Sequence, residues 1–265
     1  MENVMFAQTR QQQITKAVER HRRISVAALQ SQLGVSAATL RRDLTFLAQT
    51  GRIVRAHGGV IHPEAVSGEP AFARKVRTVP AVKAALAATA AALIPDGATV
   101  FIDAGSTTLA AGRLLLARTG LTVFTNSLPL LASGDIGGAR LVALGGEVRP
   151  ISRALVGGLA TDWLAHLRFD FAVVGASGLD LADGASTTEL LEASVKQAAL
   201  ARATRTILIA DATKWARPAA IRFAPWTDFD DWVTDHRPTR PESTRLAAHG
   251  VTLHHPPGRS KTSVA

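Results

Sequence analysis

The sequence predicts a two-domain α/β protein, in which a small helical unit with a β-ribbon precedes a larger unit built on a mostly parallel sheet. Three helical stretches open the chain and lead into a short alternating stretch that ends in a Gly pair. From Pro80 onward, short apolar runs alternate with helical stretches, which is typical of a parallel sheet covered on both faces. The length of 265 residues and the hydrophobic fraction of 47% suit one small and one ordinary domain.

The opening stretches predict two short helices and a tight turn. The first helix is expected over about 10–21, because Ile14 and Val18 then share one face. The second helix is expected over about 26–33, where two leucines lie four residues apart. Gly34-Val35 follows as the turn before a third helix.

A third helix and a β-ribbon complete the small unit. Ser36 is placed to cap this helix by accepting a bond from a free N–H, and the helix is expected to reach about Gln49. Its buried stripe is Leu40, Leu44 and Leu47. Residues 52–60 alternate apolar and polar side chains and predict a β-ribbon, so the first domain is expected over 1–60. Residues 61–80 contain three Pro and lack strong periodicity, which predicts a linker or a loosely packed bridge.

The larger unit is expected over 81–254, beginning with an Ala-rich helix over 81–93. Five buried strands and one further strand are predicted at Thr99–Asp103, Leu121–Thr125, Arg140–Leu144, Phe169–Gly175, Thr206–Ala210 and Asp231–Thr234. The remaining residues, 255–265, are rich in Pro, Gly and Ser and are predicted to form a disordered tail.

The positive charge of the chain is concentrated at its N-terminal end. The formal net charge is +9, and residues 1–62 hold nine Lys/Arg against three Asp/Glu, which leaves +3 for all the other residues. An excess packed into one small unit indicates a polyanionic partner there. On charge alone, a solvated basic surface without a partner remains the alternative.

Three helices followed by a basic ribbon form the pattern of a winged helix-turn-helix, whose second motif helix lies in the major groove of double-stranded DNA. Arg41 and Arg42 point to sides of the helix about 100° apart, so one can fork onto a guanine edge while the other meets a phosphate. The predicted DNA-binding residues are Ser36, Thr39, Arg41, Arg42 and Thr45 on the helix, with Arg52, Arg55 and His57 on the ribbon. A protein-interaction module with an ordinary basic surface is the alternative.

A loop of small residues between a predicted strand and a predicted helix indicates an anion site. Ala104-Gly105-Ser106-Thr107-Thr108 would offer backbone N–H groups and hydroxyls where the helix dipole favours negative charge. A plain tight turn with a cap would also explain this segment. Polar or Gly-rich loops follow the other predicted strands as well, and the carboxyl ends of parallel strands meet at one edge, where ligands bind. The sequence therefore predicts a ligand site at that edge.

Two segments resemble the signature of DeoR-type bacterial transcriptional regulators: Val35-Ser36-Ala37-Ala38-Thr39-Leu40-Arg41-Arg42-Asp43-Leu44 and Gly51-Arg52-Ile53-Val54-Arg55-Ala56-His57-Gly58-Gly59-Val60. The resemblance continues through Glu69-Pro70-Ala71-Phe72-Ala73-Arg74 and Lys83, and covers roughly residues 10–236. Gln30 departs from the pattern, because such regulators usually carry a small Ala there; its side chain is expected to turn outward.

The resemblance implies a sensor domain of the type found in ribose-phosphate isomerases, sugar-phosphate deaminases and CoA transferases. It implies a repressor of a carbohydrate-metabolism operon that a phosphorylated sugar or related metabolite releases from its operator. The effector-binding residues that the resemblance carries over are Asp103, Gly105, Ser106, Thr107, Thr108, Thr125, Asn126, Gly145, Gly146, Glu192, Lys196, Asp211 and Lys214, with an ordinary exposed lysine as the alternative for Lys214. Gly175 is added as an effector-binding residue because it closes the fourth of the predicted buried strands.

A sugar-phosphate isomerase or deaminase fused to a DNA-binding domain is the alternative reading of the larger unit. Related isomerases carry Asp-Gly-Ala-Asp-Glu after a strand, then a Lys-Gly-Gly-Gly-Gly loop. Here the matching stretch is Val174-Gly175-Ala176-Ser177-Gly178-Leu179-Asp180, which lacks the first two carboxylates, and the Lys-Gly run is absent. Glu192 alone is a weak set for moving a proton and steadying an enediolate. We therefore predict no catalytic residues and no enzyme activity.

The composition excludes several further classes. Without Cys, neither a disulfide nor a thiolate metal site can form, and no two His have the helical spacing of a zinc site. No metal and no cofactor are predicted. The most apolar stretch, Ala84–Leu93, is too short to span a bilayer, and no secretory segment is visible. We expect a cytoplasmic homo-oligomer, a dimer or tetramer, with no membrane partner.

Overall fold

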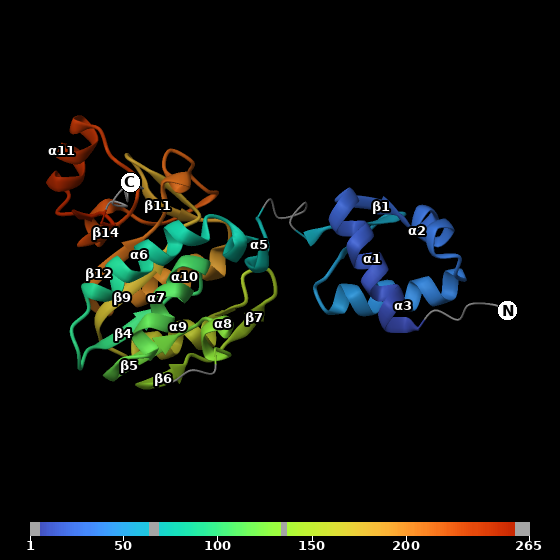
Figure 1. The fold of residues 1–265 in the computed structure, drawn as a ribbon, viewed down its shortest axis with the longest axis horizontal. Coiled ribbons are helices and arrows are strands. Elements are labelled where there is room, and N and C mark those ends of the chain that lie inside the picture. Colours follow the sequence, from blue (N-terminus) through green and yellow to red (C-terminus); the bar gives the residue numbers. More distant parts are fainter. Residues whose placement is uncertain (1–5, 64–68, 134–136, 258–265) are drawn as a thin grey trace, which may run out of the picture. The chain divides into compact units, whose positions relative to one another are not determined.

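The computed structural model describes residues 6–63, 69–133 and 137–257. The chain forms two compact units, Met1–Ala71 and Phe72–Ala265 (Figure 1). Each unit has its own hydrophobic core. The first unit is a winged helix-turn-helix and the second is a larger α/β domain with a parallel sheet, so the predicted fold class is confirmed. Within the described ranges, no helix is both long and apolar enough to cross a membrane.

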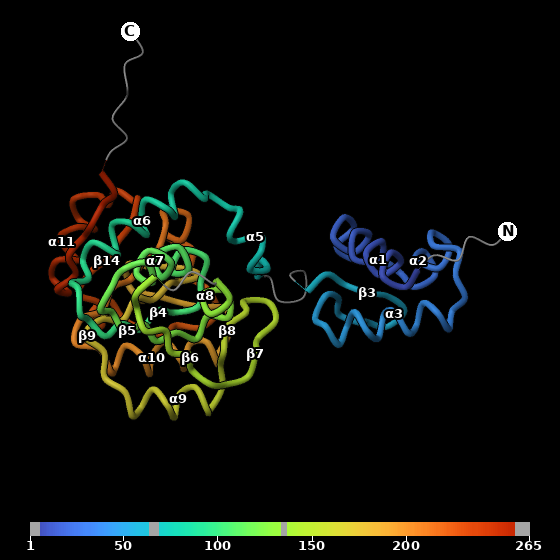
Figure 2. Tube along the Cα trace, turned by 60° about the horizontal axis from the view of Figure 1, so that its bottom comes forward, coloured from blue at the N-terminus to red at the C-terminus, as the bar shows by residue number. Residues whose placement is uncertain are grey.

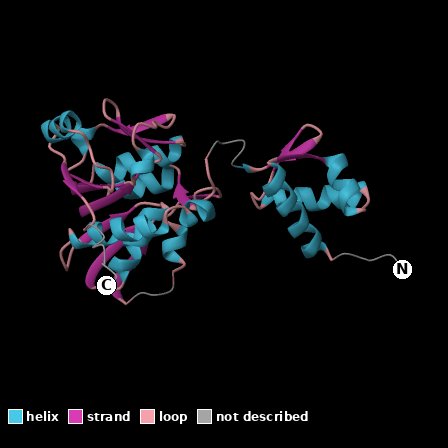
Figure 3. Cartoon of the chain, turned by 45° about the horizontal axis from the view of Figure 1, so that its top comes forward, coloured by secondary structure: helices cyan, strands magenta, loops and turns pink. Residues whose placement is uncertain are grey.

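The first unit packs three helices against a small antiparallel sheet (Figure 3). In chain order its elements are α1 (Ala7–His21), β1 (Arg23–Ser25), α2 (Val26–Leu33), α3 (Ala37–Gln49), β2 (Val54–Ala56) and β3 (Gly59–Ile61). The helices lie where the sequence predicts them, because their apolar stripes face one core. The predicted stripe of α3, Leu40, Leu44 and Leu47, is fully buried there.

The turn before α3 and its cap follow the prediction. Gly34 has a φ of 63°, and the Ser36 hydroxyl accepts a bond from the Thr39 N–H. β1 was not predicted, because three residues are too short for a strand period to be visible. β1 pairs with β3 so closely that a side chain on Gly59 would lie 2.9 Å from the Ile24 carbonyl oxygen. Gln30 is half-buried, so its side chain is only partly turned outward.

The second unit is built on a seven-stranded sheet whose strands are all parallel. In spatial order the strands are β15 (Thr252–His254), β14 (Asp231–Val233), β12 (Ala203–Ile209), β9 (Phe169–Gly175), β4 (Thr99–Ile102), β5 (Thr119–Thr125) and β6 (Gly138–Ala143). Six of these strands were predicted. β15 was not, because three residues are too few for the pattern of a strand to be visible in the sequence.

Helices cover both faces of this sheet (Figure 2). The helices of the unit are α5 (Phe72–Arg77), α6 (Pro80–Ala92), α7 (Ser106–Leu116), α8 (Leu128–Leu131), α9 (Gly158–Ala165), α10 (Leu190–Leu200) and α11 (Arg240–Ala248), with short 3-10 turns η1 (Ala212–Lys214) and η2 (Trp226–Asp228). Val100 and Ile102 pack into the cluster with α6 and α7, whereas Phe101 between them packs into the cluster with α9 and α10. The strands are therefore buried on both faces, which explains why they read as continuous apolar runs.

Smaller antiparallel pieces complete the second unit and were not predicted. They are the hairpin of β7 (Glu147–Arg149) with β8 (Ala154–Val156), and a sheet of β10 (Gly178–Asp180), β11 (Gly184–Thr187) and β13 (Ile221–Ala224). With only three or four residues each, these strands carry too little alternation to be recognised in the sequence.

Two predicted boundaries differ from the structure. Phe72, placed in the linker over 61–80, begins α5 and is buried in the core with α6 and α7, so the second unit starts before residue 81. A six-residue helix is too short to show a period. His255, placed in the tail, has its Nδ1 2.9 Å from the Thr234 carbonyl oxygen and lies at the folded edge. Residues 64–68 of the predicted linker and 258–265 of the predicted tail lie outside the described residues.

Candidate functional site

The outward face of α3 carries the residues predicted to read DNA. Arg41 and Arg42 are both exposed. Ser36 Oγ lies 3.3 Å from Thr39 N and 2.9 Å from Thr39 Oγ1, so these two hydroxyls stand together at the exposed start of the helix while capping it. The two guanidinium groups are therefore presented on a capped, rigid helix, in the form that base edges and phosphates accept.

The β2–β3 ribbon adds basic side chains beside α3. Arg55 Nη1 donates to Thr45 Oγ1 at 3.2 Å, which joins the ribbon to the helix. Arg52 and His57, the other predicted residues of the ribbon, are exposed as Arg55 is. The structure thus brings the helix and ribbon residues together through the contact between Thr45 and Arg55.

Asp43, which directly follows the arginine pair, has a different role. It is buried, and its carboxylate accepts from Arg10 Nε at 2.5 Å and from Gln11 Nε2 at 3.1 Å. The carboxylate therefore braces α1 against α3 and does not face outward. The spacing carried a signal for this, because Asp43 lies three residues after Leu40 and four before Leu47 on the buried stripe.

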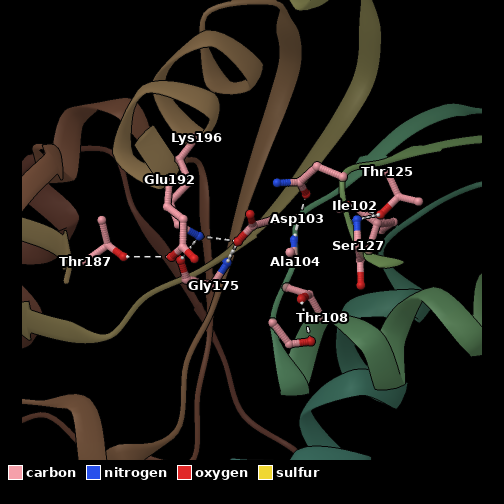
Figure 4. A network of polar contacts seen from close by, with 12 residues as sticks. Ile102, Asp103, Ala104, Thr108, Thr125, Ser127, Gly175, Thr187, Glu192 and Lys196 are labelled. Carbon is pink, nitrogen blue, oxygen red and sulfur yellow. Dashed lines mark hydrogen bonds and ion pairs between the residues drawn. The ribbon is translucent and has the colours of Figure 1, made fainter. Parts of the chain in front are cut away.

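The loops predicted to hold an effector follow strands that are neighbours in the sheet. Along its carboxyl edge, Asp211 follows β12, Gly175 ends β9, Asp103 follows β4, and Thr125-Asn126 closes β5. Gly145-Gly146 comes after the next strand, β6. Figure 4 shows the central part of this edge, with α10 contributing Glu192 and Lys196.

Asp103 and Lys196 form a buried ion pair at the centre of this edge. Lys196 Nζ donates to Asp103 Oδ2 and, at 3.0 Å, to the Gly175 carbonyl oxygen. The Gly175 N–H donates to Asp103 Oδ2 at 3.1 Å (Figure 4). The Lys196 and Asp103 side chains are 5% and 3% exposed, so each satisfies the other's charge away from solvent. The pair therefore joins β4, β9 and α10 into a frame under the predicted pocket.

The predicted anion cradle lies at the start of α7. Gly105 is the N-cap residue, and the N–H groups in the first turn after it have no acceptor within the helix. Thr108 is fully buried and donates to the Gly105 carbonyl oxygen at 3.1 Å, so this hydroxyl holds the turn. Thr107 is also buried, whereas Ser106 is partly exposed. Ser106 and the first-turn amides are thus the groups best placed to meet an anion.

The residues that close β5 form a strap to the start of this cradle. Thr125 Oγ1 donates to the Ile102 carbonyl oxygen at 2.6 Å. Asn126 Oδ1 accepts from Ala104 N at 2.8 Å, and its Nδ2 donates to the Leu155 carbonyl oxygen at 3.3 Å. Thr125 and Asn126 are both buried, so they fix where the cradle begins. Gly146 has a φ of 134°, and a side chain there would lie 2.6 Å from a backbone oxygen of β8.

Glu192 is held at the first turn of α10 by two partners that sequence reasoning missed. Its Oε1 accepts from Arg149 Nη1 at 3.0 Å, and its Oε2 accepts from Thr187 Oγ1 at 3.4 Å. Both partners come from the short strands β7 and β11, which were not predicted. Both carboxylate oxygens of Glu192 are therefore already engaged.

A second cluster of charged residues lies near the end of β12, which is two strands along the sheet from β4. Asp211 and Lys214 belong to it. Asp211 is buried and caps η1, accepting from Thr213 N at 3.0 Å. Lys83 on α6 is also buried and donates to the Lys75 carbonyl oxygen. Burial lowers the pKa of Lys83 below its ordinary value, Asp211 opposes the shift, and Lys214 and Lys75 add to it. The buried Lys83 ammonium is therefore influenced by one carboxylate and two further lysines, and the match of Lys83 to the family pattern was the available signal.

No group of three His, Asp or Glu side chains that could hold a metal ion occurs within residues 6–63, 69–133 and 137–257.

Comparison with known proteins gives matches over both units. Residues 10–66 match the DeoR-like helix-turn-helix domain, and residues 79–236 match the DeoR C terminal sensor domain. The HTH-type transcriptional regulator YgbI of Escherichia coli (strain K12) is 32% identical over 94% of this chain and 98% of its own length. The glycerol-3-phosphate regulon repressor of the same organism is 30% identical over 91% of this chain and 95% of its own length.

Among solved structures, ribose 5-phosphate isomerase A from Methanocaldococcus jannaschii is 16% identical, with a TM-score of 0.39 over 52% of this chain and 55% of that one. A likeness this slight says nothing about activity. The two domain matches together span most of the chain, and the relatives match almost end to end. The chain belongs to the DeoR family of helix-turn-helix transcriptional regulators.

Proposed function

We propose that this protein represses genes of carbohydrate metabolism and that a phosphorylated sugar or related metabolite releases it from its operator. The observation that carries this proposal is that the two units present two different kinds of binding surface. One unit presents an exposed arginine pair on a capped helix, and the other gathers polar loops around the buried Asp103–Lys196 pair. The name of one relative, a glycerol-3-phosphate regulon repressor, supports this class of genes and a small phosphorylated metabolite.

The effector is proposed to place its phosphate at the start of α7, against the first-turn amides and Ser106. Its remaining hydroxyls would face the strand-end loops, with Glu192 on one flank and Asp211 with Lys214 on the other. Two such chains, paired in the cytoplasm as a homo-oligomer, would present two recognition helices to one operator. Effector binding would favour one arrangement of the chain and lower operator affinity, and operator binding would lower effector affinity by the same factor.

We propose further that the second unit performs no catalysis. Val174 and Ser177 stand where related isomerases carry carboxylates, and both oxygens of Glu192 are bonded, one of them to a guanidinium group. A carboxylate held in this way is a poor base for proton transfer.

The test uses purified protein and a duplex that the protein itself selects from a random DNA pool. Glycerol 3-phosphate, ribose 5-phosphate, fructose 6-phosphate and glucosamine 6-phosphate are screened by thermal shift, beside their unphosphorylated counterparts. We expect one phosphate to raise the melting temperature and to weaken duplex binding, without turnover of any of the four. A counterpart that binds as tightly as its phosphate, or turnover lost in Glu192→Gln, would contradict the proposal.

The variant Ser106→Glu sharpens this test, because it puts negative charge where the phosphate belongs. We expect loss of the response to the active phosphate, with duplex binding and fold largely retained. Lys214→Ala should weaken the response less, since it removes one point charge and leaves the backbone donors in place. Thr244→Glu, exposed on α11, is the matched control and should respond as the wild type does.

A further inference from the structure

The β7–β8 hairpin stands outside the parallel sheet and is fastened to the predicted effector pocket on its β8 side. Leu155 N donates to the Asn126 carbonyl oxygen at 2.7 Å, and Leu128 N donates to the Arg153 carbonyl oxygen at 3.1 Å. The Asn126 side chain bonds both Leu155 O and Ala104 N, the first residue of the cradle loop. The Asn126 side chain therefore connects the cradle loop directly to β8, so a movement of the loop would displace β8.

The β7 side of the hairpin is fastened to the opposite flank of the same pocket. Arg149 Nη1 donates to Glu192 Oε1 at 3.0 Å, and the side chains are 14% and 10% exposed. An ion pair this sheltered is screened little by salt, so it holds β7 more firmly than a surface pair would. Arg149 thus links the carboxylate at the first turn of α10 to the hairpin.

The tip of the hairpin holds the start of the second unit. Arg153 N donates to the Arg149 carbonyl oxygen at 2.8 Å, which closes the tip into a tight turn with Arg153 at a φ of 57°. Within that turn, the Ile151 carbonyl oxygen accepts from Phe72 N at 2.9 Å. Phe72 begins α5, the first helix after the segment that leads from the DNA-binding unit.

The second half of α5 is held from the other flank of the proposed pocket. The Lys75 carbonyl oxygen accepts from the buried Lys83 ammonium, whose surroundings include Asp211 and Lys214. Two points of α5, the Phe72 N–H and the Lys75 carbonyl oxygen, are therefore held by groups that connect to the edge where the effector is proposed to bind.

We infer that Arg149 is a positioning residue that couples the effector site to α5 through the β7–β8 hairpin. The inference rests on the proposed function, because it needs an effector at the sheet edge. An anion or hydroxyl that competes for Glu192 or displaces Asn126 changes the hold on the hairpin. The tip then changes its hold on Phe72, and with it the point from which the chain leaves for the DNA-binding unit. The hairpin is the element that both binding events bias.

The first test is hydrogen exchange on the full chain without added ligand. Arg149→Met keeps the apolar stem and removes the ion pair, so the peptide over 69–78 should exchange at least about tenfold faster, while the peptides of β4 and β12 stay protected. Arg140→Met, exposed on β6 and outside the hairpin, is the matched control and should exchange as the wild type does. Arg149→Lys keeps a cation at this position, so its exchange rate over 69–78 should lie between those of the wild type and Arg149→Met. This variant replaces Arg149→Met in the test if Arg149→Met folds poorly.

The second test measures duplex affinity with and without a saturating amount of the most active of the four phosphates. At saturation the ratio of the two affinities does not depend on how tightly the phosphate binds, so it isolates coupling from binding. The wild-type ratio should lie in the usual range of about 5–150, and Arg149→Met should reduce it at least about fivefold. A merely structural role would change melting temperature and leave this ratio intact.

The outcomes separate the inference from the function on which it rests. If none of the four phosphates changes the wild-type affinity, the proposed function fails, and the exchange test still decides whether Arg149 holds α5. If the wild type responds and Arg149→Met responds with the same ratio, the inference is overturned. Unchanged exchange over 69–78 overturns it as well.

Discussion

The two units present their functional side chains in opposite ways. On the DNA-binding unit, Arg41 and Arg42 are exposed on a helix whose own stability depends on leucines that face the other way. On the sensor unit, Asp103, Asn126 and Lys196 are buried. Asp103 pairs with Lys196, and Asn126 accepts from the backbone N–H of Ala104, the residue after Asp103. The first set awaits an external partner, whereas the second set is part of the fold.

This difference determines what a substitution reveals in each unit. A change on the exposed face removes a contact with DNA and leaves the unit folded, since surface substitutions usually shift stability by less than about 0.5 kcal/mol. A change in the buried frame leaves a charged or polar group without its partner, so stability and function fall together. The three predictions below test this contrast in order of expected effect.

Lys196→Met should have the largest effect, because it strands the buried Asp103 carboxylate. We expect the sensor unit to lose about 3–5 kcal/mol of unfolding free energy. Urea unfolding followed by tryptophan fluorescence measures this unit alone, since its four Trp, at 163, 215, 226 and 232, are all of the Trp in the chain. The double variant Asp103→Asn with Lys196→Met, which carries no stranded charge, should recover part of the loss. A single variant as stable as the wild type would show that the pair does not frame the site.

Arg42→Ala, and separately Arg41→Ala, should leave that unfolding curve unchanged and weaken DNA binding instead. We expect a loss of about 1–3 kcal/mol in specific affinity from whichever arginine reads a guanine. Replacing the arginine that contacts a phosphate should instead reduce the slope of log affinity against log salt concentration by about 1. Fluorescence anisotropy with the selected duplex over a salt series distinguishes the two. Arg113→Ala, exposed on α7, is the control; binding unchanged in both α3 variants would refute the recognition-helix assignment.

The same contrast explains how far the sequence could be read. Ser36 and the arginine pair were assigned correctly to a capped, exposed helix because caps and helical periodicity are local properties. The partners of Glu192 could not be found in this way, since Arg149 lies 43 residues earlier on a three-residue strand. Asp103 and Lys196 were both singled out, but their pairing across 93 residues depends on the packing of α10 against the sheet. Local chemistry was predictable, and the network among distant residues was not.

The smallest effect on stability is expected at Lys83, where the direction in which the unfolding free energy changes with pH is the test. Because burial lowers the pKa of this lysine, the unfolded chain binds the proton more tightly than the folded chain does. Between the lowered pKa and the ordinary value, wild-type stability therefore gains with rising pH, and below that window the cost of the buried charge is present in full. Lys83→Met removes this dependence. The unfolding free energy of the variant minus that of the wild type should fall as the pH rises toward 10.5, the ordinary pKa of a lysine. Lys16→Met, exposed on α1, should give a flat difference. A flat difference for Lys83→Met too would mean that Asp211 offsets the cost of burial and that the cluster is balanced without an effector.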